Sequence, residues 1–124
     1  GHLGGSGRTL RQVLVEMMIA PLFPVPLSIF QGCTYSDYSC GDRLDLHEGV
    51  GISTCPLNHP NGACGYRFDV GGKSICVITD TEHVEGELDR TIVDFVRGAD
   101  LIGLEGIDRA ALEEGIDGRD RLHA

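Results

Sequence analysis

The sequence predicts an α+β domain, in which a mixed β-sheet of short strands is flanked by helices. Two segments, one following Gly7 and one starting at Leu88, have the 3.6-residue spacing of apolar side chains that indicates an amphipathic helix. Between them, short apolar runs alternate with turns, and 18 glycines among 124 residues fit a fold with many tight turns. A chain of this length is long enough for one domain with one core.

The first helix is predicted from apolar residues at i, i+3, i+4, i+7 and i+8, namely Leu10, Val13, Leu14, Met17 and Met18. Either Thr9 or Ser6 can cap its start, and Pro21 ends it. The next segment, "PLFPVPL", contains three prolines and cannot be helical. We expect it to be an extended, irregular apolar segment.

The middle of the chain is expected to form strands at 28–30, 43–47 and 51–56. "YRFDV" then alternates with a period of two, and Gly71-Gly72 separates it from "KSICVIT". Two glycines between strand-like runs predict a hairpin. The second run is almost continuously apolar and β-branched, which predicts a central strand.

The second helix is predicted from the apolar residues Leu88, Ile92, Val93 and Val96, with Gly98 at the position of a C-terminal cap. "ADLIGL" after it is expected to be a short buried strand. The chain is thus divided into a flexible lead (1–8), a folded domain (9–104) and a charged tail (105–124), in which 110–114 could form a helical turn.

Charge and hydropathy argue against two classes of partner. The formal net charge is -9, from 10 basic and 19 acidic residues, so no general nucleic-acid binding is expected. There is no run of eighteen apolar residues and no signal-peptide pattern, so we expect a cytoplasmic protein that does not enter the membrane.

The five cysteines do not form a recognisable pattern. Their odd number predicts no disulfide framework, and the absence of CxxC argues against a structural zinc cage. Cys76 lies inside an apolar strand and is expected to be a small buried residue. None of the cysteines has an evident base nearby, so no nucleophile is predicted.

Two polar residues follow predicted strands directly, His59 and Asp80. Strand ends place side chains at the rim of a sheet, where sites are commonly built. An imidazole and a carboxylate both suit zinc, and they also suit iron or manganese. His83 is within reach of the same rim, as are the possible supporting residues Asn58, Thr81 and Glu82.

An ordinary interpretation stands beside each of these residues. A histidine before a proline is commonly a surface residue, and Asp80-Thr81 could simply cap a helix. Two ligands also do not make a site, because a catalytic zinc normally needs three protein ligands.

The stretch "LNHPNGACGYRFDVGGKSICVITDTEH", with "VRGADLIGLEG" after it and "GRTLRQVL" and "PLFPVPL" before it, resembles the metallo-β-lactamase superfamily, in its ribonuclease Z-like branch of stand-alone hydrolases. The resemblance covers residues 7–104. It implies the C-terminal half of an αββα sandwich, with His59 as a metal ligand and Asp80 as the carboxylate that bridges two metals. Members hydrolyse phosphodiesters or related esters, and His83 would lie at the rim of the site.

The family's main ligand motif, His-x-His-x-Asp-His, is absent, as is the last histidine ligand. The resemblance therefore implies a half domain that is incomplete as a catalyst and could lack an N-terminal half. Its unpaired sheet face would be apolar, so we expect a homodimer that completes the sandwich by symmetry. The alternative is a non-catalytic oligomerising or binding module that kept the fold and lost the reaction.

Overall fold

The computed structural model describes residues 3, 6–84 and 86–105, and of Leu46 only the backbone. The chain divides into two compact units. One is His2–Ser39, and the other is Cys40–Ala124 together with Gly1. Each is described by itself. The possible helical turn at 110–114 lies outside the described residues.

Helix α1 of the first unit confirms the predicted N-terminal helix and spans Leu10–Met17. Its cap is Thr9 and not Ser6. The Thr9 hydroxyl accepts from the Gln12 amide, and the Gln12 side chain accepts from the Thr9 amide, which is a capping box. Asp37 Oδ1 accepts from the Leu10 amide at 2.7 Å and so satisfies a further amide of the first turn. The helix ends short of Pro21, with Met18 as its C-cap.

The strand predicted at 28–30 is wrong, because Leu27–Ile29 form the 3₁₀-helix η2. Pro26 precedes this turn with φ -75°, a value suited to starting a helical turn, and its carbonyl accepts from the Ile29 amide at 3.1 Å. The three-proline segment contains no α-helix, as predicted, although its last residue, Leu27, begins η2. It turns and bends where an extended run was expected.

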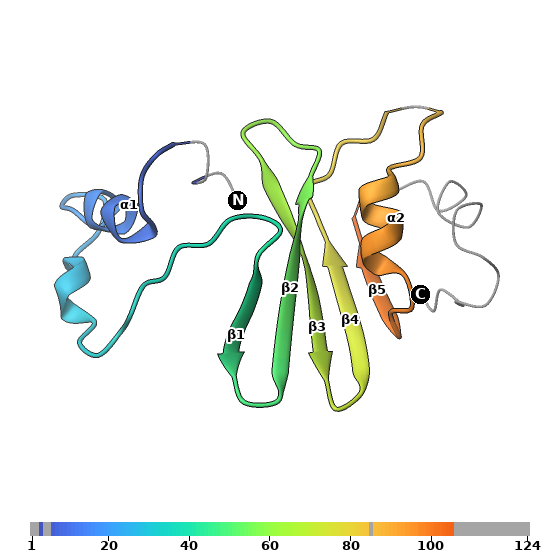
Figure 1. Cartoon of the computed structure of the whole chain (residues 1–124). Coiled ribbons are helices and arrows are strands. Elements are labelled where there is room, and N and C mark those ends of the chain that lie inside the picture. The colour runs from blue at the N-terminus through green and yellow to red at the C-terminus, as the bar shows by residue number, and fades with distance from the viewer. Residues whose placement is uncertain (1–2, 4–5, 85, 106–124) are drawn as a thin grey trace. The chain divides into compact units, whose positions relative to one another are not determined.

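The second unit is built on a mixed sheet of five strands in the order β1-β2-β3-β4-β5 (Figure 1). The strands are β1 (Arg43–His47), β2 (Val50–Leu57), β3 (Ala63–Val70), β4 (Lys73–Ile78) and β5 (Leu101–Leu104). The first four pair antiparallel, and β5 pairs parallel to β4. The predicted α+β class and these strands are confirmed, although β3 begins before the "YRFDV" run.

Glycines shape this sheet at two places. Gly71 and Gly72 have φ of 57° and 76°, which confirms the predicted hairpin between β3 and β4. Gly65 allows a close approach inside β3, because a Cβ there would lie 2.6 Å from the Cδ1 atom of Ile78. A larger residue at 65 would displace the core of the sheet.

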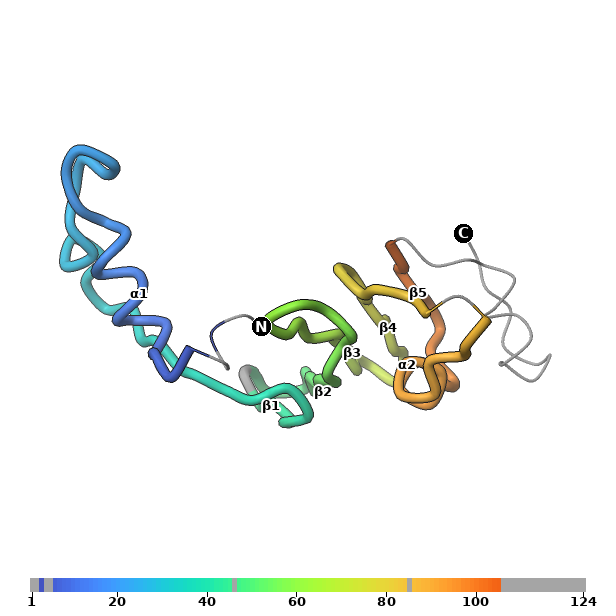
Figure 2. Tube along the Cα trace, turned by 90° about the horizontal axis from the view of Figure 1, so that it is seen from above, coloured from blue at the N-terminus to red at the C-terminus, as the bar shows by residue number. Residues whose placement is uncertain are grey.

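Helix α2 (Arg90–Val96) lies against one face of the sheet, here called the covered face (Figure 2). Asp89 caps its start by accepting from the amides of Thr91 and Ile92. Gly98, with φ 67°, follows the C-cap and confirms the predicted end. The core between helix and sheet consists of Cys55, Leu57, Ala63, Cys76, Ile78, Ile92, Val93 and Val96.

Arg67 reaches from the covered face to the end of α2. Its guanidinium donates to the carbonyl oxygens of Phe95 at 3.1 Å and Arg97 at 2.9 Å, and to the Ser74 hydroxyl at 3.1 Å. Carbonyls at a helix C-terminus have no partner within the helix, and they carry partial negative charge. The Arg67 side chain therefore caps the C-terminal end of α2.

The opposite face of the sheet is exposed over β4 and β5, where buried strands were expected. Ile75, Val77 and Leu101 are 45%, 38% and 45% exposed. Tyr66 pairs with Val77 and Phe68 with Ile75, so both rings lie on this face, and their centroids are 6.4 Å apart. These five residues are here called the open face. The β-branched run of β4 is therefore central in the sheet but buried on one side only.

The start of β5 is tied to β4 by Asp100. Its carboxylate accepts from the Ser74 amide at 2.8 Å and from Lys73 Nζ at 2.6 Å. The hydrogen bond from Lys73 lowers the pKa of Asp100, and the same bond raises the pKa of Lys73. This link sets the register in which β5 joins the sheet.

Candidate functional site

The topology of the sheet brings the C-terminal ends of β2 and β4 to the same end of the sheet. Here, an edge of the sheet means one of the two ends of its strands and not an outermost strand. Both strands are antiparallel to β3, which lies between them, so they run in the same direction. His59 follows the end of β2 and Asp80 follows the end of β4. The two predicted ligands therefore lie on turns at the same edge, as expected from the sequence.

His59 lies on the turn formed by residues 58–62, which joins β2 to β3. The turn is closed by the Gly62 amide, which donates to the His59 carbonyl at 2.9 Å. Asn61 has φ 63°, a left-handed conformation that asparagine tolerates better than most residues. The imidazole is half-buried.

Asp80 also has a left-handed backbone, with φ 59°, and its side chain is exposed. Aspartate, like asparagine, adopts this conformation more readily than most residues. Asp80 does not cap a helix, because α2 begins at Arg90 and is capped by Asp89. The ordinary interpretation of the Asp80-Thr81 pair is thus excluded.

Two hydrogen bonds join these turns directly. The Glu82 amide donates to the Asn58 carbonyl at 2.6 Å, and Asn58 Nδ2 donates to the Glu82 carbonyl at 2.9 Å. Asn58 and Glu82 thus link the turns through one side-chain amide and the backbone. The Glu82 carboxylate is not part of this link.

The imidazole of His59 is held in one tautomer. Nδ1 lies 2.8 Å from the Pro60 carbonyl oxygen. A carbonyl oxygen only accepts hydrogen bonds, so Nδ1 carries the proton and a neutral ring has its lone pair on Nε2. A backbone carbonyl on Nδ1 is the usual partner of a histidine that binds a metal through Nε2.

Thr81 is an unusual residue in the second turn. It is 9% exposed, and among the described residues its Oγ1 is a buried polar atom without a hydrogen-bond partner. Buried hydroxyls are normally paired, because leaving one unsatisfied costs on the order of 1–3 kcal/mol. This orphaned oxygen next to Asp80 is a departure from ordinary packing.

The described residues include no group of three or more His, Cys, Asp or Glu side chains that could hold a metal ion. His83 and Glu82 are exposed. A carboxylate that sequence reasoning missed, Glu105, follows β5 at the same edge, and its amide donates to the Ile78 carbonyl at 3.1 Å. The parallel pairing of β5 is what brings it there, and the sequence did not reveal that pairing.

The cysteines differ from the prediction in one respect. Cys40 and Cys64 form a disulfide, and Cys33 is an exposed free thiol. Cys76 is fully buried, as predicted. Burial raises the pKa of the Cys55 thiol to about 11, and burial also raises the pKa of Cys76. These two thiols stay protonated at neutral pH and are not nucleophiles.

A shallow hollow of about 710 Å³ lies at the opposite edge of the sheet, between the β1–β2 and β3–β4 turns. Its charged residues include Arg43, Asp45 and Asp69. The start of β2 lies there, whereas His59 follows the end of β2. This hollow is therefore separate from the predicted ligands.

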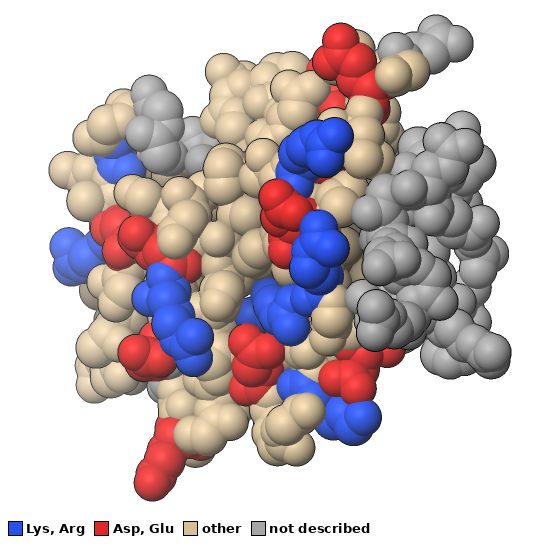
Figure 3. Space-filling model, turned by 45° about the vertical axis from the view of Figure 1, so that its right-hand side comes forward, with Lys and Arg blue, Asp and Glu red and all other residues tan. Residues whose placement is uncertain are grey.

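Figure 3 shows basic and acidic side chains interspersed on one face of the molecule. Ion pairs join Arg67 to Asp69, Lys73 to Asp100 and Arg97 to Asp94. Acidic side chains lie beside the basic ones on this face, so its charge is mixed. None of the helices in the described part of the chain has the length and apolar character needed to cross a membrane.

Comparison with known proteins adds no relative. A scan against protein-family models and a search of curated proteins each found no match to the chain. The resemblance to the metallo-β-lactamase superfamily stays a prediction that rests on the motifs quoted above.

Proposed function

We propose that this chain supplies half of a divalent-metal site, with His59 and Asp80 as its two ligands, in a protein descended from metal-dependent hydrolases of phosphodiester or related ester bonds. The observation that carries the proposal is the pair of hydrogen bonds between Asn58 and Glu82, which joins the His59 turn to the Asp80 turn. These two ligands are incomplete as a catalyst, and the remaining donors come from an N-terminal half or from a symmetric partner.

Two further features support a metal at this edge. The bond from His59 Nδ1 to the Pro60 carbonyl orients Nε2 as the donor nitrogen. Asp80 keeps an exposed carboxylate on a left-handed backbone. Imidazole and carboxylate together fit zinc first, and iron or manganese as well. A divalent metal supplies activation of water and stabilisation of negative charge on an ester.

Each residue of the edge then has a distinct role. His59 and Asp80 bind the metal, whereas Asn58 and Glu82 hold the two turns together. Thr81 places a hydroxyl oxygen beside Asp80, and His83 lies on the rim. Only the first two are ligands, which is one fewer than a catalytic zinc normally has.

Zinc and manganese titration of the purified protein, followed by calorimetry, tests the proposal. We expect one weak site per chain, lost in His59→Ala and in Asp80→Ala. His47→Ala is the matched control, because His47 lies at the end of β1, next to the hollow at the other edge, and its Nδ1 also contacts a backbone carbonyl, that of Glu48. Equal binding by all three variants would contradict the assignment.

Catalysis is tested separately with bis-(p-nitrophenyl) phosphate. We expect no turnover by the chain alone, even with saturating metal, because two ligands do not hold a reactive centre. Turnover by the isolated chain that vanishes in Asp80→Ala would show that the site is complete and would overturn the half-site.

A second candidate function is an oligomerising module, and the open face favours it. Ile75, Val77 and Leu101 are more than one third exposed, and soluble monomers rarely expose large contiguous apolar patches. In this function two copies pair their open faces about a two-fold axis, as the αββα sandwich would require.

Light scattering at micromolar concentration distinguishes the two oligomeric states. We expect a dimer for the wild type and a monomer for Val77→Lys, which places a charge at the centre of the open face. Thr91→Lys, which adds the same charge at an exposed position of α2, away from the open face, is the control and stays dimeric. A monomeric wild type would reject this module.

A further inference from the structure

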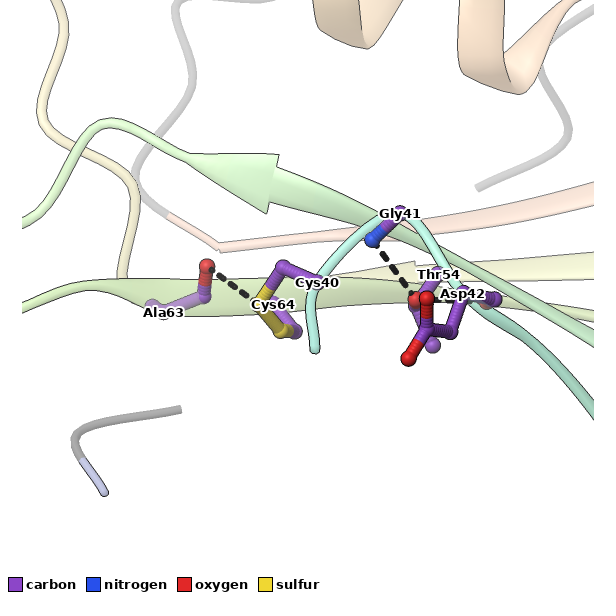
Figure 4. The surroundings of a disulfide bond; sticks show 6 residues. All are labelled: Cys40, Gly41, Asp42, Thr54, Ala63 and Cys64. Atoms are coloured by element: carbon purple, nitrogen blue, oxygen red, sulfur yellow. Dashed lines mark hydrogen bonds between the residues drawn. A yellow bond between two sulfur atoms is a disulfide. The ribbon is translucent and has the colours of Figure 1, made fainter. Parts of the chain in front are cut away.

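A disulfide fastens the chain at the edge that bears the candidate site. Cys40 precedes β1, and Cys64 is the second residue of β3, with 5.6 Å between their Cα atoms. Cys64 is 7% exposed, whereas Cys40 is half-buried. Cys40 Sγ also lies 3.5 Å from the Ala63 carbonyl oxygen, so Cys40 contacts both of the first two residues of β3 (Figure 4).

The segment that holds Cys40 is also bonded to β2, through Thr54. The Gly41 amide donates to Thr54 Oγ1 at 2.9 Å, and Thr54 Oγ1 donates to the Asp42 carbonyl at 2.7 Å (Figure 4). The Thr54 amide donates to the same carbonyl at 3.1 Å. These bonds do not involve the disulfide, so we expect β1 to stay paired with β2 when the disulfide is broken.

The disulfide lies at the base of the His59 turn. Ala63 pairs with Leu57 across the open end of that turn, and Cys64 is the next residue. The turn is joined in its own right to the Asp80 loop through Asn58 and Glu82. A covalent bond at position 64 therefore restrains the start of β3. The His59 turn leads directly into this strand end, and the Asp80 loop is joined to that turn.

We infer that the Cys40–Cys64 disulfide is a redox-sensitive clamp that orders the His59 turn and the Asp80 loop. A dithiol reductant opens it: its thiolate attacks the more exposed Cys40 sulfur, and Cys64 leaves as a thiolate. The second thiol of the reductant then releases Cys40 and closes the reductant's own disulfide. Two electrons and two protons pass to the protein.

Opening the clamp removes a restraint on the chain, so local opening at this edge becomes more frequent. The candidate ligands then spend less time in one geometry, and the metal site weakens. This last consequence rests on the proposed metal half-site, whereas the ordering of the two turns does not.

Amide hydrogen exchange tests the clamp without any metal. The reporters are the amides of Gly62 and Glu82, whose hydrogen bonds close the His59 turn and join it to the Asp80 loop. After reduction with dithiothreitol we expect both to exchange roughly tenfold faster. The Asp100 amide, which donates to the Ser74 carbonyl away from the disulfide, should exchange at an unchanged rate.

Two variants test whether loss of the Cys40–Cys64 disulfide causes the faster exchange. Cys40→Ala/Cys64→Ala should exchange like the reduced wild type and should not respond to dithiothreitol. Cys33→Ser, which removes an exposed free thiol, should behave like the oxidised wild type. If the double variant does not fold, the reduced wild type still gives the answer.

Four results separate the hypotheses. Equal exchange of Gly62 and Glu82 in the oxidised and reduced protein would overturn the clamp, as would alkylation of Cys40 and Cys64 without prior reduction. Manganese binding that weakens about tenfold on reduction supports both the clamp and the half-site. Faster exchange without manganese binding in either state supports the clamp and rejects the half-site.

Discussion

The two faces of the sheet differ in what covers them, although the same strands build both. In β4, Cys76 and Ile78 point to the covered face and are 0% exposed, whereas Ile75 and Val77 point to the open face and are 45% and 38% exposed. All four side chains belong to one apolar run. The covering helix, and not hydropathy, therefore decides which residues form the core.

The difference has a consequence for stability and association. Side chains under α2 are fully buried within one copy of the chain, so their contribution does not depend on protein concentration. Side chains of the open face can become fully buried only against another surface. The comparison can thus be tested by substitutions at matched positions on the two faces.

The largest effect is expected from truncating one isoleucine on each face. Ile78→Ala leaves a cavity beneath α2 and should lower the free energy of unfolding by about 3–4 kcal/mol. Ile75→Ala, three residues earlier, should cost less than about 1 kcal/mol in a dilute sample. Urea denaturation of the two variants measures both values.

The outcome of this pair can also sharpen the comparison. If the cost of Ile75→Ala grows with protein concentration while that of Ile78→Ala does not, the open face is buried by self-association. Similar large costs at all concentrations would show that another part of the chain covers both faces, and the distinction drawn here would be wrong.

A smaller effect is expected from the cation that holds α2 on the covered face. Arg67→Met keeps much of the side-chain volume but leaves the carbonyls of Phe95 and Arg97 without this donor. We expect a loss of about 2–3 kcal/mol, because hydrogen bonds to charged groups are stronger than neutral ones. Thermal unfolding followed by circular dichroism measures it.

Arg67→Lys is the matched control. It keeps the charge near the C-terminus of α2, but one ammonium group cannot replace both Nη1, which donates to the two carbonyls, and Nη2, which donates to Ser74. It should recover part of the loss, through the favourable interaction of a cation with the helix end. An equal loss in both variants would show that the placement of the guanidinium donors matters and the charge does not, and no loss in either would remove the capping role.

Local patterns in the sequence predicted most of the elements. The helix at Leu10, the hairpin at Gly71-Gly72, the end of α2 at Gly98 and the strands of the sheet follow from spacing and turn residues. The strand expected at 28–30 failed because Pro26 starts a 3₁₀ turn there, and a short apolar run does not distinguish these outcomes.

The candidate site was predictable only in part. Strand ends in the sequence placed His59 and Asp80 on a rim, and antiparallel pairing on either side of β3 puts them at the same edge. The Cys40–Cys64 pair and the position of Glu105 depend on contacts between distant segments, and the spacing of residues along a chain does not determine such contacts.

The smallest expected effect concerns the thiol of Cys55, which belongs to the covered face and is 5% exposed. Burial raises its pKa from 9.0 to about 11, so the folded state retains a proton that the unfolded state loses first. The stability that this group contributes is complete below pH 9 and is lost as the pH rises from 9 to about 11.

We therefore compare the unfolding free energy of the wild type with that of Cys55→Ala. Between pH 8 and pH 10.5 we expect the wild type to lose about 1–2 kcal/mol more than the variant. Urea denaturation of both proteins in a reducing buffer measures this difference and cancels the titration of groups that they share. A constant difference would mean that water reaches Cys55 in the folded protein, and the covered face would then be less well closed than the contrast between Ile75 and Ile78 implies.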